Sequence, residues 1–444
     1  MSWSDGNRFI RLLQPLNPMM MKRLLFLACV VMLSAPITLR AQSLNPILKT
    51  LLDSSEYFNF CNTYASDSLT LDPVNRAFFG GWYQHLVGHH SYSSYLANQV
   101  LQMPGGSGNR DSLEVSMWEL RSENELRLGN YAASKDACAK ALTYRGVLSA
   151  KDSSDLGNTM HLLDPVRDMP PQTLERKGDA DIKYTRDLLG LVHVPVTINQ
   201  TDGNYIWDTG ANFSTMMESE AKRCGIHLIN ADFSVTSSSQ SAVKSKLGMA
   251  DTVRIGSLLF HHVLFLIMPD EDLRFAGGLY KIKGIIGLPV IMQFGEVQIK
   301  DDGHLFSPVE STPCSLHNLT LNGFTPFTEI EIFHQKHTYI FDMGAAASIF
   351  GTKFRAAYAD SLQTGKEKQA GVGGAGGTQK IQILKAKNVS YKMGGNSGIL
   401  SNAVIQLHGA DDAFRSYFGI AGEDIFRNYK TMIINFREMY VLLK

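Results

Sequence analysis

The sequence predicts a multidomain protein of α and β class, in which a helical N-terminal part precedes a β-rich part made of two duplicated halves. Residues 45–163 space their apolar and small side chains as paired helices do. After Leu191, short apolar strands alternate with turn residues, and the same order of segments then occurs a second time. The length of 444 residues also exceeds what one hydrophobic core usually serves.

Composition narrows the class of protein further. Hydrophobic residues make up 44% of the chain and charged residues 19%, as in folded soluble proteins rather than disordered chains. Lys and Arg together number 42, as do Asp and Glu, so no basic field points to a nucleic-acid partner. The function must therefore depend on local motifs rather than on bulk charge.

The N-terminus has the pattern of a signal peptide. Residues 19–41 contain a short basic region, an apolar run at 24–33 and a small residue at the end, and the run is too short for a comfortable membrane span. Residues 1–18 precede the basic region and are expected to be an upstream extension. Removal of residues 1–41 leaves 37 Lys and Arg against 41 Asp and Glu. We therefore expect an exported, mildly acidic protein, periplasmic or secreted, with no stable membrane span.

The helical domain is expected at residues 42–164. The stretch GNYAASKDACAKAL (129–142) resembles the second half of a tetratricopeptide repeat, in which a Gly turn and a Tyr precede a helix rich in small residues. Residues 86–101 have a similar layout, with Tyr92 placed 39 residues before Tyr131. A plain helical bundle is the alternative interpretation.

A linker and two halves are expected after the helices. Residues 165–185 are polar and contain prolines, which is typical of an exposed linker. The stretches YIWDTGANFSTM (205–216) and YIFDMGAAASIF (339–350) share six of twelve residues, where chance would give about one. This match predicts a duplication, with one half at residues 186–312 and the other at 313–444.

Two landmarks recur at nearly the same offset in the two halves. Asp208 and Asp342 are 134 residues apart, and each follows a strand and opens the sequence Asp-x-Gly-Ala. Gly287 and Gly422, each preceded by two apolar residues, are 135 residues apart. Agreement at two separate places supports the duplication more strongly than either motif alone.

These motifs resemble those of the aspartic proteinases in their two-lobed, single-chain form. Ala211 and Ala345, which follow the Asp-x-Gly motifs, are more similar to the retropepsin-type branch than to the pepsin branch. The stretch GEDIFRNYKTMIINF (422–436) resembles the closing segment of bacterial retropepsin-like proteins. The resemblance covers residues 190–444 and leaves out the helical region, and it implies a bilobal all-β protease domain in a bacterial protein.

The resemblance implies that Asp208 and Asp342 form a catalytic dyad. Two carboxyls that face each other cannot both ionise easily, so they share one proton. The ionised carboxyl then serves as the general base toward water, and the protonated one hydrogen-bonds to the scissile carbonyl. Gly210 and Gly344 are expected where the chain must turn sharply to bring the carboxyls together. No metal and no organic cofactor is expected.

The residue after each Asp differs between the halves. In the family it is usually Thr or Ser, whose hydroxyl hydrogen-bonds to the backbone of the opposite lobe. Thr209 fits this pattern and is expected to support the dyad, whereas Met343 departs from it and leaves one side without the hydroxyl. Ser214 and Ser348 recur at one place in the two motifs and are interpreted as structural hydroxyls, because no adjacent His-Asp pair is evident.

Hairpins that could close over a bound peptide are expected in both halves. Residues 235–250 lie where a flap belongs in the first half, although they contain no flap tyrosine of the pepsin type. In the second half the Gly-rich stretch 371–380 offers Gly373, Gly374 and Gly376 as flap candidates, with a mobile surface loop as the alternative. Its glycines also fit G-x-G-x-x-G, but a strand-like stretch follows instead of a helix, which argues against a dinucleotide site.

Histidines and cysteines give weaker signals. Adjacent histidines occur at 89–90 and 261–262, but neighbouring side chains diverge, so surface or partly buried positions are expected rather than a metal site. Export permits disulfide bonds, and four cysteines allow three pairings between which the sequence does not choose. These four are Cys61, Cys138, Cys224 and Cys314.

Together these observations predict an exported aspartic endopeptidase that hydrolyses extended peptide segments between its lobes. Its partners would be peptide or protein substrates, with no nucleic acid. The rival interpretation is a catalytically inactive module of the same fold that binds peptides or proteins. In that case the helical domain would recruit a protein partner. Met343 favours the inactive module, and the retained pair of Asp residues favours the enzyme.

Overall fold

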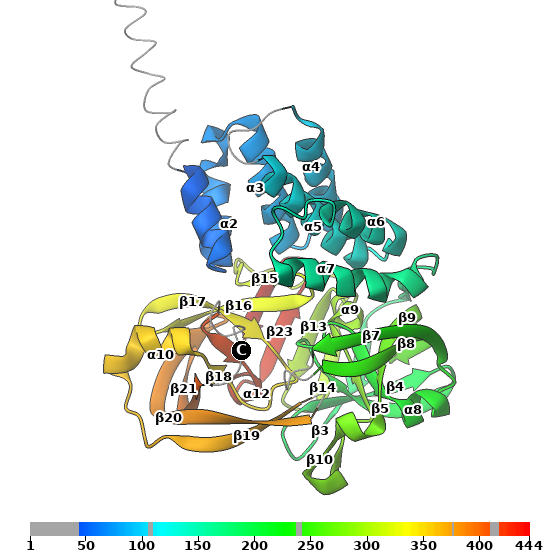
Figure 1. Ribbon diagram of the computed structural model, residues 1–444. Coiled ribbons are helices and arrows are strands. Elements are labelled where there is room, and N and C mark those ends of the chain that lie inside the picture. The colour runs from blue at the N-terminus through cyan, green and yellow to red at the C-terminus, as the bar shows by residue number, and fades with distance from the viewer. Residues whose placement is uncertain (1–43, 105–109, 237–241, 375–376, 409–416) are drawn as a thin grey trace, which may run out of the picture.

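The computed structural model describes residues 44–104, 110–236, 242–374, 377–408 and 417–444. The predicted signal peptide at 19–41 lies outside these residues. As predicted, a helical region is followed by a β-rich region (Figure 1). The helices of the first region are 44–53, α2 (Tyr57–Asp67), α3 (Pro73–Leu86), α4 (His90–Gln102), α5 (Arg110–Arg127), α6 (Tyr131–Ala141) and α7 (Ala150–Leu163).

Local sequence sets where several of these helices begin. Asp72 caps α3 by accepting a hydrogen bond from the backbone N–H of Asn75 at 3.0 Å, and Pro73 occupies the first turn, where its missing N–H costs nothing. Ser149 and Asp152 form a reciprocal capping box at the start of α7. Consecutive helices are in contact, α3 with α4 and α5 with α6. This pairing fits a repeat and a plain bundle equally, so the tetratricopeptide-like identity stays a prediction.

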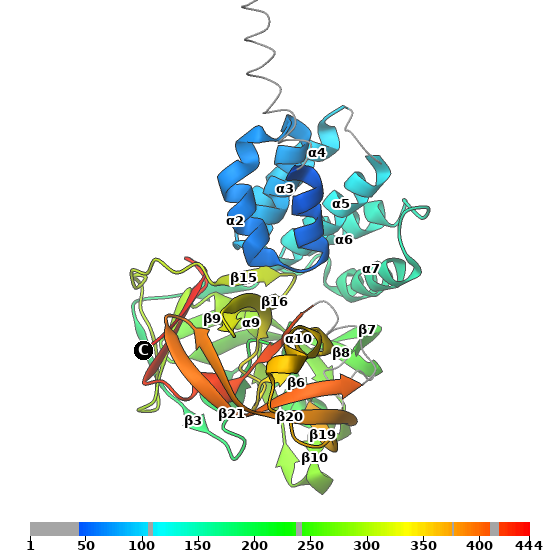
Figure 2. The ribbon, with the colours of Figure 1, turned by 90° about the vertical axis from the view of Figure 1, so that its left-hand side faces the viewer.

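The β-rich region forms three larger sheets over the described residues. The sheet of the first half contains β1 (Thr173–Glu175), β3 (Thr185–Arg186), β4 (Val192–Ile198), β5 (Thr201–Trp207), β6 (Ser214–Met217), β7 (His227–Thr236), β8 (Ala242–Ile255), β9 (Leu258–Met268) and β12 (Gly284–Ile286). The sheet of the second half contains β15 (Leu319–Asn322), β16 (Thr325–Ile332), β17 (Gln335–Phe341), β18 (Ile349–Phe350), β19 (Lys368–Gly374), β20 (Gly377–Met393), β21 (Asn396–His408) and β22 (Gly419–Ala421). Figure 2 shows β20 and β21 curving below the helices.

A third sheet joins the two halves. Its order is β2 (Ala180–Lys183), β14 (His304–Ser307), β13 (Glu296–Lys300), β23 (Thr431–Asn435) and β24 (Tyr440–Leu443). The antiparallel pairing of β13 with β23 connects the end of the first half to the end of the second. The two halves therefore share backbone hydrogen bonds and form one continuous structure.

Short elements complete the β-rich region. A small hairpin consists of β10 (Arg274–Phe275) and β11 (Tyr280–Lys281). The short α-helices are α8 (Glu218–Arg223), α9 (Leu288–Met292), α10 (Thr352–Tyr358) and α12 (Glu423–Phe426). Single 3-10 turns lie at Ser68–Thr70, Asp164–Val166, Asp270–Leu273, Ala276–Gly278 and Ala359–Ser361. No helix among the described residues has both the length and the apolar character needed to cross a membrane.

The segment 165–185 is not the exposed linker that was predicted. β1 pairs with β9, and β2 pairs with β14 in the sheet that joins the halves. Within β2, Ala180 and Ile182 are buried while the residues between them are exposed. The polar and proline-rich composition of the segment concealed this short alternating pattern, and pairing partners about eighty and 120 residues away in the chain stabilise the strands.

The turn between β4 and β5 also differs from the expectation. The sequence Thr-Asp-Gly at 201–203 suggested the turn, but the left-handed residues are Asn199 and Gln200, with φ of 45° and 70°. In the second half, Phe333 and His334 take the same conformation, 134 residues later. Two consecutive left-handed residues make the tight turn that suits the twist of a hairpin.

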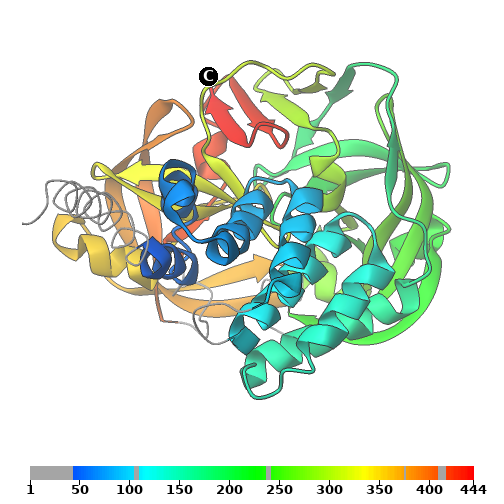
Figure 3. The same cartoon turned by 90° about the horizontal axis from the view of Figure 1, so that it is seen from above.

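The helical region packs across both halves, as the view from above shows (Figure 3). Leu163 of α7 joins a buried cluster with Leu247 and Leu266 of the first half. A second buried cluster combines Phe60 of α2 with Phe327 of the second half. The helical region is thus a continuation of the folded core rather than an appended module.

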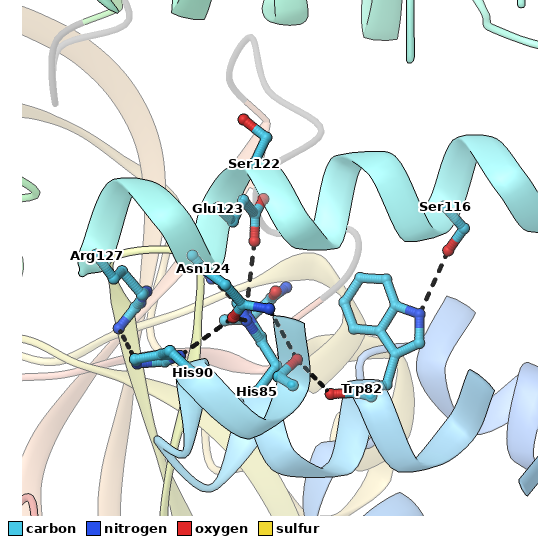
Figure 4. A network of polar contacts seen from close by, with 12 residues as sticks. Trp82, His85, His90, Ser116, Ser122, Glu123, Asn124 and Arg127 are labelled. Atoms are coloured by element: carbon cyan, nitrogen blue, oxygen red, sulfur yellow. Dashed lines mark hydrogen bonds and ion pairs between the residues drawn. The ribbon is translucent and has the colours of Figure 1, made fainter. Parts of the chain in front are cut away.

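A buried polar network also joins the helices to the second half (Figure 4). Asn124 Oδ1 lies 2.7 Å from Nδ1 of His85 and 3.3 Å from Nδ1 of His90, and Arg127 reaches the other ring nitrogen of His90 at 3.2 Å. The backbone N–H of Gly323 donates to Nε2 of His85 at 3.3 Å. Burial lowers the pKa of His85 to about 3 and that of His90 to about 2, so both rings stay neutral. His90 is therefore a core residue, more buried than the sequence suggested.

We expect Leu163→Ala to lower the free energy of unfolding by about 2–5 kcal/mol, because the fully buried side chain leaves a cavity between the helices and the first half. Urea unfolding followed by circular dichroism measures the change. Leu69 is 82% exposed, and Leu69→Ala, as the control, should change the free energy by less than about 0.5 kcal/mol. Wild-type stability of Leu163→Ala would contradict the packing of the helices on the first half.

Candidate active site

The two Asp motifs occupy matching positions in the two halves. β12 lies between β5 and β6, pairing parallel with the first and antiparallel with the second. β22 pairs in the same way with β17 and β18. The backbone N–H of Asp208 donates to Ile286 at 3.1 Å, and that of Asp342 donates to Ala421 at 3.0 Å. The apolar strands that precede Gly287 and Gly422 therefore hold the two Asp loops, as the spacing predicted.

The structure brings the carboxyls of Asp208 and Asp342 together, and they are hydrogen-bonded to each other. Each also accepts a hydrogen bond from its own loop: Gly210 N–H donates to Asp208 Oδ1 at 2.8 Å, and Gly344 N–H donates to Asp342 Oδ1 at 2.8 Å. Ala345 N–H adds a bond to Asp342 Oδ1 at 3.1 Å. Asp342 thus has the larger number of backbone donors, which favours its ionised form.

Gly210 and Gly344 are needed because each lies against the carboxyl of the opposite half. A Cβ at Gly210 would lie 2.5 Å from the carboxyl carbon of Asp342, and one at Gly344 would lie 2.3 Å from that of Asp208. Neither glycine has a left-handed φ. The sharp turn expected from the sequence is therefore not the reason for these glycines; the reason is the close approach of two loops far apart in the chain.

The environment separates the roles of the two carboxyls. Burial, and then the negative charge of Asp342, raise the pKa of Asp208 well above its ordinary value. Burial also raises the pKa of Asp342, but the hydrogen bond from Asp208 and the backbone donors of its loop oppose that rise. Asp208 is therefore the carboxyl that keeps the proton, and Asp342 the one that ionises first.

Thr209 makes the cross-lobe contact that the sequence predicted. Its Oγ1 donates to the carbonyl oxygen of Phe341 at 3.0 Å and accepts a hydrogen bond from the N–H of Met343 at 3.0 Å. Met343, at the matching place in the second half, is 0% exposed and packs in the main hydrophobic core. Because a thioether has no proton to donate, the hydroxyl contact is made from one side only.

The two recurring serines are structural, as the sequence suggested. Ser214 Oγ accepts a hydrogen bond from Gly287 N–H at 3.1 Å, and Ser348 Oγ accepts one from Gly422 N–H at 3.0 Å. These bonds tie each Asp loop to its neighbouring strand. Ser348 also donates to Asp424 at 2.6 Å, a bond specific to the second half.

Glu423 is a residue that the sequence reasoning missed. It follows Gly422, where Leu288 follows Gly287 in the first half, and the duplication offset of 135 could have revealed the difference. The Glu423 side chain is 0% exposed, and its Oε2 accepts a hydrogen bond from Arg186 Nη1 at 2.5 Å. Burial raises the pKa of Glu423 to about 7, against the opposing effect of Arg186.

Both stretches proposed as flaps belong to hairpins. In the first half β7 pairs with β8 up to Thr236 and Ala242, and residues 237–241 lie outside the described part. In the second half β19 pairs with β20, and Gly373 and Gly374 lie in β19 next to the turn. Gly376 lies outside the described residues. The hairpins are present, and their closure over a bound peptide stays a prediction.

The remaining sequence candidates lie elsewhere. Over the described residues, no group of three or more His, Cys, Asp or Glu side chains is arranged to hold a metal ion. His261 contacts Glu175 at 2.8 Å on the pair of strands that begins the β-rich region. The four cysteines outside the predicted signal peptide are free thiols.

Comparison with known proteins bears on the first half. Residues 194–290 match a family described as aspartyl protease, and this match includes Asp208 and Gly287. No curated protein matches the chain. Among solved structures, the chain is similar to a retropepsin-like aspartic protease from Rickettsia conorii, with 18% identity over 31% of this chain and 95% of that chain and a TM-score of 0.23. So low a TM-score carries no argument, but the family match supports the resemblance to retropepsin-like aspartic proteases.

We expect Gly344→Ala to lower the melting temperature and to disrupt the dyad, because the new Cβ would overlap the carboxyl of Asp208 and the loops would have to separate. Differential scanning calorimetry measures the change. Gly178 has nothing within 4 Å of an added Cβ, so Gly178→Ala is the matched control and should melt close to the wild type. Equal melting of the two variants would contradict the close approach of the loops.

We expect Met343→Thr to lower the free energy of unfolding by about 1–3 kcal/mol, because a shorter polar side chain replaces a fully buried apolar one in the core. Chemical denaturation measures the loss. Met343→Leu, which keeps the apolar volume, is the control and should cost less than about 1.5 kcal/mol. Wild-type stability of Met343→Thr would instead indicate that a new cross-lobe hydrogen bond offsets the lost packing.

Proposed function

We propose that the protein is an exported aspartic endopeptidase that hydrolyses peptide bonds between its two halves. The observation that carries this proposal is the hydrogen-bonded carboxyl pair of Asp208 and Asp342, held by matching loops with the proton on Asp208. The family match over residues 194–290 supports the same chemistry. We also infer that the matching pairings around the two loops descend from one duplicated unit.

The geometry suggests how the two carboxyls divide the reaction. Asp342 accepts a proton from a water molecule while the water oxygen attacks the carbonyl carbon of the peptide. Asp208 gives its proton to the carbonyl oxygen, and a tetrahedral diol forms. The diol collapses as the proton on Asp342 passes to the amide nitrogen and the C–N bond breaks, and one hydroxyl proton of the diol returns to Asp208. The dyad then holds one proton, as at the start.

The substrate is an extended peptide segment, because the halves present strands and hairpins around the dyad that suit pairing with an extended backbone. The signal-peptide pattern at residues 19–41 supports a periplasmic or secreted location in a bacterium. The helical region buries apolar clusters on both halves, which favours a role in supporting the protease part.

The second candidate function is peptide or protein binding without hydrolysis, with a partner recruited by the helical region. The buried Met343 favours it, because the cross-lobe hydroxyl contact is made only by Thr209. The hydrogen-bonded dyad favours the peptidase. Incubation of the purified protein with a diverse peptide pool between pH 3 and pH 7, followed by mass spectrometry, separates the two functions.

We expect Asp208→Asn and Asp342→Asn each to abolish peptide hydrolysis, because the shared proton requires both carboxyls. Both should fold, since removing one of two repelling carboxyls relieves their repulsion. Asp251 is exposed on the first half, and Asp251→Asn is the control with unchanged turnover. Either dyad variant with wild-type turnover would overturn the assignment.

The pH profile tests the same dyad. Asp342 must be ionised, and its raised pKa places the acid limb of kcat/KM above about 3.9, the ordinary value for Asp. Asp208 must be protonated, and its pKa, raised well above the ordinary value, allows activity to extend toward neutral pH before the alkaline limb begins. An acid limb below about 3.9 would contradict these assignments.

A further inference from the structure

The second half carries a buried carboxylate where the first half carries an apolar side chain. Glu423 and Leu288 occupy the same place, and the backbone N–H of each donates to the alanine of its own Asp motif at 2.9 Å, Ala345 and Ala211 respectively. Leu288 is fully buried in the core. Glu423 is equally buried, and its Oε1 has no hydrogen-bond partner among the described residues. A buried carboxylate costs free energy unless something in the structure requires it.

The partner of Glu423 comes from the opposite half. Arg186 lies on β3 of the first half, and its Nη1 donates to Glu423 Oε2 at 2.5 Å, a contact between residues 237 positions apart. The same nitrogen donates to the carbonyl oxygen of Gly190, and the guanidinium lies 5.6 Å from the centre of the Tyr184 ring. Tyr184 OH in turn donates to the carbonyl oxygen of Lys300 in β13. Arg186 is thus held by the first half and the joining sheet.

The charges around Glu423 leave Arg186 as its main stabilising contact. Arg427, on the same short helix, adds a second positive charge, and Asp342 adds a negative one. The guanidinium donates to the carboxyl group whether that group is ionised or protonated. The link to Arg186 therefore persists in either state of Glu423.

Each half therefore contributes one polar link to the other half near the dyad. From the first half, Thr209 binds the backbone at Phe341 and Met343. From the second half, where Met343 supplies no hydroxyl, Glu423 binds Arg186 and at the same time holds the loop of Asp342 through Ala345. The two links act on the two sides of the carboxyl pair.

We propose that the Arg186–Glu423 pair is the second cross-lobe clamp of the dyad and takes the place of the hydroxyl that Met343 lacks. Glu423 is on this proposal a positioning residue, which acts on Asp342 through the Asp loop and does not touch the substrate. The proposal deepens the peptidase function and rests on it. It accounts for a buried carboxylate at a place where the first half needs only leucine.

The central test is Glu423→Leu, which copies the residue of the first half. The variant should fold, because an apolar side chain of similar size replaces a buried charge and Arg186, with 27% of its side chain exposed, can turn to solvent. We expect kcat to fall at least tenfold with KM changed less than threefold, since a misplaced dyad impairs the chemical step more than binding. Glu423→Gln keeps an acceptor oxygen for Arg186 and should recover much of the loss.

A matched control exists within the first half. Glu220 is also buried and pairs with Arg223 at 2.7 Å, but both residues belong to the same half. Glu220→Leu should leave kcat within about twofold of the wild type once corrected for the folded fraction. Equal losses of kcat in Glu220→Leu and Glu423→Leu would show a general effect of buried carboxylates and would overturn the proposal.

A double-mutant cycle tests the replacement itself. In the Met343→Thr background, which restores a hydroxyl, Glu423→Leu should reduce kcat less than it does in the wild type. Additive losses would overturn the claim that the pair takes the place of the hydroxyl.

Hydrogen exchange gives a test that requires no substrate. The amides of Gly344 and Ala345, which donate to Asp342, should exchange faster in Glu423→Leu than in the wild type and in Glu220→Leu. If the wild type cleaves no peptide, the proposed function fails, but faster exchange still supports the clamp. Unchanged exchange at both amides overturns the clamp whether or not the protein is a peptidase.

Discussion

The close approach of the Asp208 and Asp342 carboxyls is the constraint on which the rest of this structure depends. Two acidic groups in contact within protein repel each other unless they share a proton, so their loops must be held together by other forces. The strands β12 and β22 hold each loop within its own half, and the sheet around β13 and β23 holds the halves together. The absence of a Cβ at Gly210 and Gly344 leaves the space that the carboxyls occupy.

The two sides of this site are alike in backbone and unlike in side chains. Both loops have the same pairings and the same Ser-to-Gly hydrogen bond, but Thr209 faces Met343 and Leu288 corresponds to Glu423. A symmetric homodimer would have to make the same contact twice, whereas a single chain can make a different contact on each side. The unequal environments also place the proton on one particular carboxyl, which a fully symmetric pair would not do.

The helical region contributes to the same constraint from outside the site. Its apolar side chains are buried on both halves, and Arg127 of α5 lies 4.7 Å from the centre of the Phe324 ring in the second half. Phe324 in turn packs against Phe213, five residues after Asp208. A continuous set of side chains thus connects the helices to an active-site loop, so a change in the helices can reach the dyad through packing.

The sequence by itself determined the order of the parts, the doubled motif and the two carboxyls, because these depend on local patterns: strand periodicity, a Gly after the Asp, and a constant offset. Only the tertiary structure decided the strands within 165–185, the true reason for Gly210 and Gly344, and the pairing of Arg186 with Glu423. Each of these depends on residues far apart in the chain, and a sequence pattern carries no record of which distant backbone or side chain will lie within a few ångströms.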